Sequence, residues 1–363
     1  MTNNEPLILK NLIEVPLSPW MKSKEEKGEI VLSSRIRLAR NLKDNIFPNR
    51  AGSKSLIEVI QKTEKLKDIL SQKDDKEYGF FLLSDLNTLE KNILAEKHIT
   101  SVQHIKDSNN RALLISEDAE VSIMINEEDH LRIQITKPGL NLWSALEKAS
   151  FIDNILTDNL NIAFDERLGF LTSCPTNLGT GLRASVMLHL PALCLTGQIN
   201  KIISISTKLS LTVRGLYGEG TEAFGNIFQI SNQITLGQNE NEIINNLILV
   251  TEQIIQREEA ACVFLGQEKS SQLSDRIWRS LGVLLYARSI SGRESLAKLS
   301  DVKLGVDMGL INDLEPDFFN NLLIATQDNV LRYTFKNEHL TEEQLNIFRA
   351  DTIRERLNKY YRR

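Results

Sequence analysis

Ten residues in the middle of the chain combine a thiol, two glycines and a permanent positive charge. They run Cys174-Pro-Thr-Asn-Leu-Gly-Thr-Gly-Leu-Arg183. Glycine allows a backbone to approach a phosphate closely, and an arginine fork matches phosphate oxygens. We expect a helix from Arg183, whose N-terminal N–H groups would favour an anion and, together with Arg183, the thiolate form of Cys174. The segment therefore predicts an anion site beside a reactive cysteine.

Two common nucleotide-binding patterns are disfavoured. Gly179-Thr-Gly181-Leu-Arg-Ala184 fits the loose dinucleotide pattern G-x-G-x-x-A, which alone is weak evidence. That fold places an acidic residue about twenty positions later, yet no Asp or Glu occurs from Arg167 to Gly218. No Gly-Lys-Ser/Thr follows the glycines. Any phosphate site here must therefore be of another kind.

The same acid-free stretch is strongly basic. It holds Arg167, Arg183, Lys201, Lys208 and Arg214, and further arginines lie at Arg35, Arg37 and Arg132. Arginines from separate segments could clamp a polyphosphate. The alternative is that these arginines are scattered surface charges in ion pairs. Arg35 and Arg37, however, have strand spacing beside apolar neighbours, where a solvated charge is less expected.

Two acidic features bracket the basic residues. Glu127, Glu128 and Asp129 occupy one predicted turn, and Glu219 lies between two glycines. Carboxylates can orient a planar guanidinium and remove its proton when a phosphoryl group is transferred to it. The pattern therefore favours a cationic substrate, with Cys174 beside it. Solvated loops, and a buried apolar role for Cys174, are the alternatives; for Cys194 and Cys262 the buried role is the expected one.

Composition sets the class of protein. The chain has 363 residues, of which 41% are hydrophobic and 25% charged, with a net charge of -5 and three cysteines. These values are ordinary for a soluble globular protein, and they argue against a general nucleic-acid binder, a disulfide framework, a cysteine zinc site and a membrane protein. The N-terminus lacks a secretory pattern. We expect a cytoplasmic protein with free thiols.

Periodicity predicts an α+β domain followed by an all-helical domain. The polar stretch from Gly266 to Gln272 reads as a linker, with a first domain at 1–261 and a helical domain at 262–363. In the latter, Ser291 with Glu294 and Thr341 with Gln344 have capping-box spacing. The expected elements are strands at 28–41 and 201–215, a hairpin at 119–135, and helices at 55–70, 142–160, from 183, 241–256 and 274–289.

Four sequence blocks resemble the signatures of the phosphagen kinases, the family of arginine and creatine kinases. They are SSRIRLARN, NEEDHLR, CPTNLGTGLRASV and RGLYGEG, in that order. The resemblance implies transfer of a phosphoryl group from ATP, with Mg²⁺, to a guanidino group. It also implies that the catalytic domain is an antiparallel sheet flanked by helices. It implies that Glu128 and Glu219 hold the guanidinium and supply the base, with Cys174 beside it. No metal site built from protein side chains is expected. The implied nucleotide contacts are Ser33, Ser34, Arg35, Ile36, Arg37, His98, Arg132, Arg183, Ala184, Ser185, Val186, Met187, Arg214, Gly215, Leu216, Tyr217, Gly218 and Glu219.

The domain order is similar to that of the bacterial protein-arginine kinases, because a helical domain follows the catalytic domain instead of preceding it. The resemblance implies that the substrates are proteins with exposed arginines, including a heat-shock repressor. It also implies two further partners, a zinc-binding activator protein and a Clp ATPase-protease. A kinase for a free guanidino metabolite and a non-catalytic phosphoarginine adaptor are the alternatives. A homodimer through the helical domain and a self-contained bundle both fit the pattern.

A phosphoarginine pocket is the last feature of the resemblance. Arg349 and Ala350 match its pattern Arg-Asp-x-x-Arg-Ala, whereas Leu345 and Asn346 replace the Arg-Asp pair. Two interpretations stay open: an allosteric phosphoarginine site, or a helix with basic residues near its C-terminal end.

Overall fold

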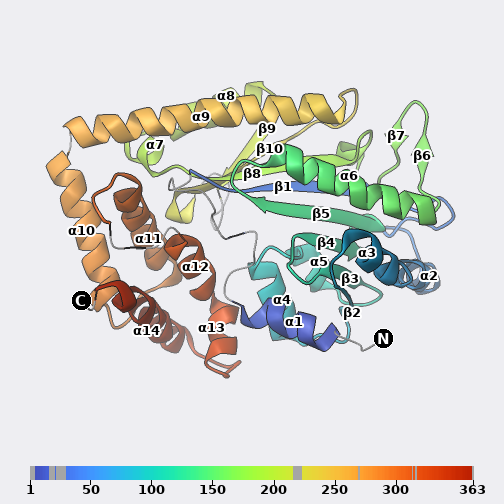
Figure 1. The fold of residues 1–363 in the computed structure, drawn as a ribbon, viewed down its shortest axis with the longest axis horizontal. Helices are drawn as coiled ribbons and strands as arrows, with labels where there is room; N and C mark the ends of the chain where they lie inside the picture. Colours follow the sequence, from blue (N-terminus) through green and yellow to red (C-terminus); the bar gives the residue numbers. More distant parts are fainter. Residues whose placement is uncertain are drawn as a thin grey trace. The chain divides into compact units, whose positions relative to one another are not determined.

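The computed structural model describes residues 5–15, 21, 30–215, 223–268, 270–312, 314 and 317–361. Figure 1 shows the fold. The strands are β1 (Val31–Arg40), β2 (Tyr78–Leu82), β3 (Ala112–Ser116), β4 (Val121–Ile125), β5 (Leu131–Pro138), β6 (Phe164–Asp165), β7 (Gly169–Phe170), β8 (Leu182–His189), β9 (Leu211–Gly215) and β10 (Ile227–Asn232). The helices are α1 (Glu5–Glu14), α2 (Ser53–Glu64), α3 (Leu66–Asp74), α4 (Thr88–Glu96), α5 (Val102–Lys106), α6 (Leu142–Asn159), α7 (Pro191–Leu195), α8 (Ile199–Lys208), α9 (Glu240–Glu268), α10 (Ser270–Tyr286), α11 (Gly292–Asp307), α12 (Phe318–Ala325), α13 (Asp328–Thr334) and α14 (Glu342–Tyr361).

Eight strands form one sheet in the order β2-β3-β4-β5-β1-β8-β10-β9, and β6 and β7 form a separate hairpin. The pairs β2/β3, β3/β4, β4/β5 and β5/β1 are antiparallel. The predicted antiparallel sheet with flanking helices is therefore confirmed. The chain divides into two compact units: residues 1–20, 33–185 and 232–247 form unit 1, and residues 21–32, 186–231 and 248–363 form unit 2.

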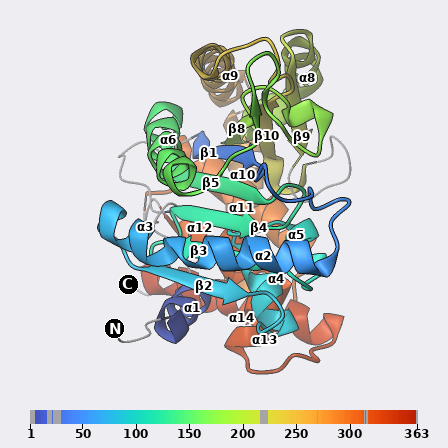
Figure 2. The same ribbon diagram turned by 90° about the vertical axis from the view of Figure 1, so that its right-hand side faces the viewer.

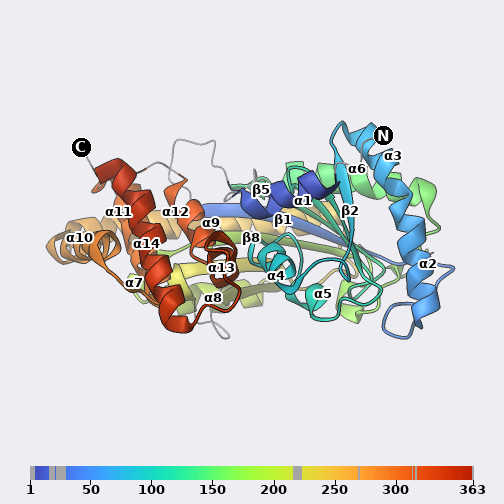
Figure 3. The same cartoon turned by 90° about the horizontal axis from the view of Figure 1, so that it is seen from below.

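In unit 1 the two faces of the sheet have different coverings. Directly paired residues of antiparallel strands place their side chains on the same face. Phe81, Leu113 and Met124 are paired in sequence across β2, β3 and β4, and they pack in one core cluster with Ile8 of α1 and Leu94 of α4. Figures 1 and 3 show α1 and α4 beside these strands. One face of the sheet is thus covered by α1 and α4 over β2 to β4.

The opposite face of the sheet carries mostly apolar side chains, and these are buried. Ile36, Ile123, Ile133 and Ile135, at alternate positions of β1, β4 and β5, have no exposed surface. Helix α6 lies along β5 (Figure 2), and its Ala149 and Ile152 are also fully buried. The strand and helix periods place these residues inward. A rigid core therefore supports the residues that β1 and β5 carry on the first face.

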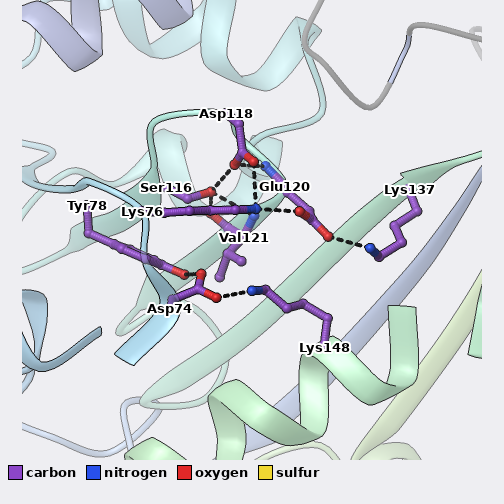
Figure 4. A network of polar contacts seen from close by, with 9 residues as sticks. All are labelled: Asp74, Lys76, Tyr78, Ser116, Asp118, Glu120, Val121, Lys137 and Lys148. Atoms are coloured by element: carbon purple, nitrogen blue, oxygen red, sulfur yellow. Dashed lines mark hydrogen bonds and ion pairs between the residues drawn. The ribbon is translucent and has the colours of Figure 1, made fainter. Parts of the chain in front are cut away.

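Ion pairs fasten the edge of the same sheet (Figure 4). Lys76, which precedes β2, lies 2.6 Å from both Asp118 and Glu120. Glu120 also pairs with Lys137 of β5 at 2.7 Å. Lys148 of α6 contacts Asp74, at the end of α3. These contacts join segments far apart in sequence and hold β5 in register beside the helices.

Unit 2 ends in the predicted helices. Ile277, Leu281 and Leu284 of α10 are buried, as their spacing predicts. Ser291 accepts a hydrogen bond from the Glu294 N–H at 3.2 Å, and Thr341 and Gln344 form a reciprocal capping box. Figure 3 shows α10, α11 and α14 side by side. Across the described residues, no helix has the length and apolar character needed to cross a membrane.

Three predictions of local structure are wrong. The segment from Arg183 belongs to the strand β8 and not to a helix. Its apolar residues are buried on both faces, so its sequence pattern is the same as that of a short buried helix. Much of the predicted strand region 201–215 is the helix α8, in which Ile202 and Ser206 are buried four residues apart. The predicted linker is helical where described: α9 continues to Glu268 and α10 begins at Ser270.

Candidate active site

Three arginines share one face of the sheet in unit 1. Arg37 pairs with Gln134, and Ala39 pairs with Arg132, across β1 and β5. Arg35, two residues before Arg37, therefore lies on the same face as Arg37 and Arg132. This is also the face of Met124, which pairs with Arg132. The strand spacing that predicted a common side for Arg35 and Arg37 is confirmed, and the pairing adds Arg132.

The loop after α4 brings His98 to this face. Gln134 donates a hydrogen bond to the backbone oxygen of His98 at 2.9 Å, and His98 adopts a left-handed backbone conformation with φ 58°. Burial, and then the charge of Arg35, lower the pKa of His98 to about 4. His98 is therefore a neutral imidazole close to Arg35 at neutral pH.

The arginines repel one another in a partly desolvated place. Burial, followed by the charge of Arg132, lowers the pKa of Arg35 to about 10. The pKa of Arg37 falls well below its ordinary value because of burial and then the charges of Arg35, Arg132 and Arg183. The buried Nε of Arg37 finds no hydrogen-bond partner among the described residues. Positive charges gathered in a desolvated place favour a polyanionic ligand.

The acidic turn between β4 and β5 separates two neighbouring glutamates. Glu127 is 9% exposed and accepts hydrogen bonds from Arg132 and from Ser101, each at 2.7 Å. Burial opposes ionisation of Glu127, but Arg132 and Ser101 outweigh it and lower the pKa of this carboxyl. Glu128, in contrast, is exposed, whereas the other residues of the turn are buried. Glu127 is therefore held inside the fold by its hydrogen bonds, whereas the Glu128 side chain is accessible to a substrate.

A chain of polar contacts connects Glu128 to the thiol of Cys174. The Asn177 side-chain nitrogen lies 3.5 Å from a carboxylate oxygen of Glu128. The Asn177 side-chain oxygen accepts a hydrogen bond from Arg183 Nε at 3.2 Å. Arg183 also donates to the hydroxyl of Thr176 at 3.1 Å. That hydroxyl lies 3.1 Å from the Cys174 sulfur. The structure therefore brings together Glu128, Arg183 and the half-buried Cys174.

Asn41 and Asp129 hold this arrangement. The buried Asp129 carboxylate accepts from the Ser173 N–H and from the Asn41 amide, both at 2.6 Å. Asn41 also accepts from the His130 N–H and donates to the Leu171 oxygen. Asn41 and Asp129 thereby fix the acidic turn, the end of β1 and the start of the cysteine segment. The sequence places Asp129 in the acidic turn, but no local pattern predicts its buried structural role or its contact with Asn41.

The two glycines of the segment serve protein packing. Gly179 and Gly181 have φ of 105° and 66°, values that favour glycine. An added Cβ at Gly179 would meet the Thr235 oxygen at 2.7 Å, and one at Gly181 would meet the Arg40 side chain at 2.6 Å. The predicted helix start at Arg183 is absent, and Pro175–Asn177 form a short 3₁₀ turn instead. The predicted anion site would therefore depend on arginine side chains and not on a helix N-terminus.

The other predicted nucleotide contacts are mostly buried. Ser34 donates its hydroxyl to the Gly139 oxygen at 2.7 Å and accepts from the Asn141 N–H at 3.0 Å, so it anchors β1. Each side chain of the remaining set in β1 and β8 is at most 8% exposed: Ser33, Ile36, Ala184, Ser185, Val186 and Met187. Their roles as nucleotide contacts stay predictions.

In unit 2, Arg214 is exposed near the end of β9 and is followed by Gly215. Leu216, Tyr217, Gly218 and Glu219 lie outside the described residues. The predicted pairing of Glu219 with Glu128 therefore stays a prediction. Cys194 and Cys262 are free, and burial raises the pKa of both thiols to about 12. Neutral thiols of this kind fit the expected structural role.

Arg349 is fully engaged inside unit 2. It is 2% exposed and donates to the backbone oxygens of Thr326 and Ile290 at 3.0 and 3.1 Å and to Asn346 at 2.7 Å. It also pairs with Asp328. Ala350 is 2% exposed. These contacts leave the guanidinium of Arg349 few donors for a phosphoarginine, whose binding here stays a prediction.

Comparisons with known proteins identify the family. Residues 58–261 match the ATP:guanido phosphotransferase C-terminal catalytic domain, and residues 270–363 match the protein-arginine kinase McsB C-terminal domain. The chain is 45% identical to a protein-arginine kinase from Brevibacillus brevis over 348 residues, which is 96% of this chain and 97% of that protein. It is 46% identical to one from Bacillus subtilis over 353 residues, covering 96% of each. The chain belongs to the protein-arginine kinase family.

Solved structures agree with the fold class. A duplicated taurocyamine kinase from Schistosoma mansoni with bound transition-state analogue components superposes with a TM-score of 0.57 at 26% identity, covering 68% of this chain and 36% of that one. A lombricine kinase gives a TM-score of 0.55 at 26% identity over 70% and 76% of the chains. Within the part of the chain that the structure describes, no three His, Cys, Asp or Glu side chains gather as a metal site.

Proposed function

We propose that this protein transfers the γ-phosphoryl group of ATP to arginine side chains of other proteins. One observation carries the proposal: an exposed carboxylate, Glu128, is connected through Asn177 to Arg183, whose charge acts on the crowded Arg37. Such a site has an acceptor for a cationic substrate and donors for a polyphosphate within one unit. The names of the family's relatives point to the same reaction.

The arginines would hold the nucleotide. Arg35, Arg37, Arg132 and Arg183 are suited to the triphosphate because several forks can share its charge, and Arg214 would complete the set. His98, neutral beside Arg35, would be a nucleotide contact. Mg²⁺ would enter with the phosphates, to which it is bound along with water.

Glu128 would orient the substrate guanidinium, together with Glu219 from its own segment. As the bond from the guanidino nitrogen to phosphorus forms, the bond from the γ-phosphorus to the oxygen of ADP breaks. The proton that leaves the nitrogen passes to a carboxylate, a transfer that typically contributes about 10²- to 10⁴-fold to the rate. Cys174 would lie beside the guanidinium, held by Thr176. Positioning and charge neutralisation would supply most of the remaining acceleration.

The cellular setting is part of the same proposal. Phosphorylated arginines would mark proteins for a Clp ATPase-protease and inactivate a heat-shock repressor, with a zinc-binding protein as activator, in the cytoplasm. A homodimer would use the helical region of unit 2, where Trp278 and Tyr286 are 48% and 75% exposed. Family resemblance supports the partners, and the exposed aromatic side chains support the dimer.

Phosphosite mapping of a protein mixture treated with this kinase and Mg-ATP tests the reaction. Mild, non-acidic conditions are needed because phosphoarginine is acid-labile. We expect phosphoarginine on protein side chains, and a large loss with Glu219→Ala or Cys174→Ser. A parallel reaction with free arginine examines the small-metabolite alternative. Phosphorylation of free arginine without any protein phosphoarginine would overturn the proposal, and ATP turnover separates a kinase from an adaptor.

A further inference from the structure

Unit 1 contains a pocket that has no role in the candidate active site described above. It has a volume of about 500 Å³ and is formed by the hairpin β6–β7, the backbone at Gly179 and Thr180, and residues 235–241. We refer to it as the hairpin pocket. Figure 1 shows the hairpin and the start of α9 that contribute to it.

Large apolar side chains stand exposed around the hairpin pocket. Phe164, Leu168 and Leu236 line it and are 55%, 44% and 48% exposed. Exposed apolar side chains that gather around a hollow, instead of lying singly, are typical of a surface that binds a partner. The hairpin itself is firmly placed, because the Phe170 N–H donates to the Gly179 oxygen at 2.8 Å and the Phe170 ring stacks on the Arg40 guanidinium at 3.4 Å.

One charge of the hairpin pocket is partly removed from water. Glu240 is half-buried, and its carboxylate accepts no hydrogen bond and forms no ion pair with the described residues. Burial therefore raises its pKa, although the charge of Arg40 opposes this. Arg167, the cation that lines the pocket, is exposed. A half-buried carboxylate without donors is complementary to a cationic group that arrives with an apolar neighbour.

Thr235, which lines the hairpin pocket, is hydrogen-bonded to the segment that carries Cys174. Thr235 donates its hydroxyl to the backbone oxygens of Thr176 and Leu178 at 3.0 and 2.7 Å. Thr176 also contacts the Cys174 sulfur. An occupant of the pocket would therefore contact residues that are bonded to the cysteine segment.

We propose that the hairpin pocket docks a segment of the substrate protein in which a basic side chain is followed by large apolar residues. This inference rests on the proposed function, because it supplies protein recognition outside the site of phosphoryl transfer. The basic group meets Glu240, and the apolar residues cover Phe164, Leu168 and Leu236. A polypeptide substrate then gains affinity that a free guanidino molecule cannot obtain.

Binding of a fluorescent peptide to the full-length protein without ATP tests this directly. The probe carries one lysine followed by leucine and phenylalanine, so it can dock but presents no arginine to phosphorylate. A matched peptide replaces the lysine by glutamate. We expect the glutamate peptide to bind about tenfold more weakly, since a paired charge is replaced by a repulsive one. Equal binding of the two peptides would contradict the role of Glu240.

Matched variants test the lining residues. Glu240→Gln and Leu236→Ser should each weaken binding of the lysine peptide by roughly five- to tenfold. Their controls, Glu166→Gln and Ile234→Ser, change an exposed acid of the same hairpin and an exposed apolar residue of the same segment that do not line the pocket. These controls should bind like the unchanged protein. A loss of binding in the controls equal to that in the lining variants would overturn the proposal.

Kinetics separate docking from the reaction. If docking aids phosphorylation, Glu240→Gln raises the KM for a protein substrate and leaves the KM for a short arginine compound unchanged. Absence of phosphoarginine with the unchanged protein would refute the proposed function but not the docking site, which the lysine peptide decides. Conversely, phosphorylation with no peptide binding would refute the docking site alone.

Discussion

The adjacent glutamates Glu127 and Glu128 should respond in opposite ways to the same substitution. Glu127→Gln should destabilise the protein, because its carboxylate is the buried counter-charge of Arg132 and lies near Arg37. Glu128→Gln should leave stability almost unchanged, since Glu128 is exposed and makes one long contact to Asn177. Phosphorylation activity should show the opposite order, with the larger loss for Glu128→Gln, because Glu128 is the residue placed to contact a guanidinium.

The structure sets the size of the effect. Breaking a buried ion pair typically costs about 3–5 kcal/mol. Gln at position 127 can still accept from Arg132, and the Ser101 hydroxyl can turn to accept from the new amide, so hydrogen bonds are retained in weaker, neutral form. Arg132 is also 23% exposed and keeps access to water. We therefore expect a loss of about 2 kcal/mol for Glu127→Gln, and less than about 0.5 kcal/mol for Glu128→Gln.

Urea unfolding at pH 7, followed by circular dichroism, measures both variants under one set of conditions. The expected result is a lower midpoint for Glu127→Gln with an unchanged slope. Phosphorylation is then measured on the folded proteins at a temperature where both are fully native. Equal stability of the two variants, or a normal rate for Glu128→Gln, would refute the assignment of Glu127 to structure and Glu128 to the substrate.

Three further substitutions or conditions follow from the same contacts. Gly181→Ala should cost about 2 kcal/mol or more of unfolding free energy, because φ is 66° and the new Cβ meets Arg40; an unchanged melting temperature would contradict this. Arg349→Ala should cost about 3 kcal/mol of unfolding free energy, because Arg349 is buried among the contacts given above; an unchanged midpoint of urea unfolding would contradict this. Burial lowers the pKa of both His104 and His130 to about 4. The unfolded chain therefore binds more protons below about pH 6.5, and each histidine should remove about 2 kcal/mol of stability by pH 5, measured as a falling urea midpoint.

The antiparallel half of the fold was predictable from local patterns. Alternation in β1, and the hairpin of β4 and β5 around an acidic turn, carry the strand period directly in the sequence. The segment from Arg183 was not predictable in this way. Its burial on both faces removes the alternation that separates a strand from a helix, and only the neighbouring strands decide between them.

The candidate site was predictable by residue type and much less by geometry. Arg35 and Arg37 could be placed on one face by strand spacing, whereas the position of Arg132 on that face depends on the pairing of β1 with β5. The difference between Glu127 and Glu128 could not be predicted, because it depends on Ser101 and Arg132 approaching from other segments. The buried pair of Asn41 and Asp129 is likewise visible only after the chain has folded.

In the proposed reaction, Glu128 acts directly on a guanidinium while the arginines hold ATP. Phosphoarginine formation by Glu128→Gln, measured together with its affinity for ATP in the full-length protein, tests this. We expect phosphoarginine formation to fall by at least about 10²-fold while ATP binds as tightly as before. Unchanged phosphoarginine formation, or a loss that follows weaker ATP binding alone, would contradict it.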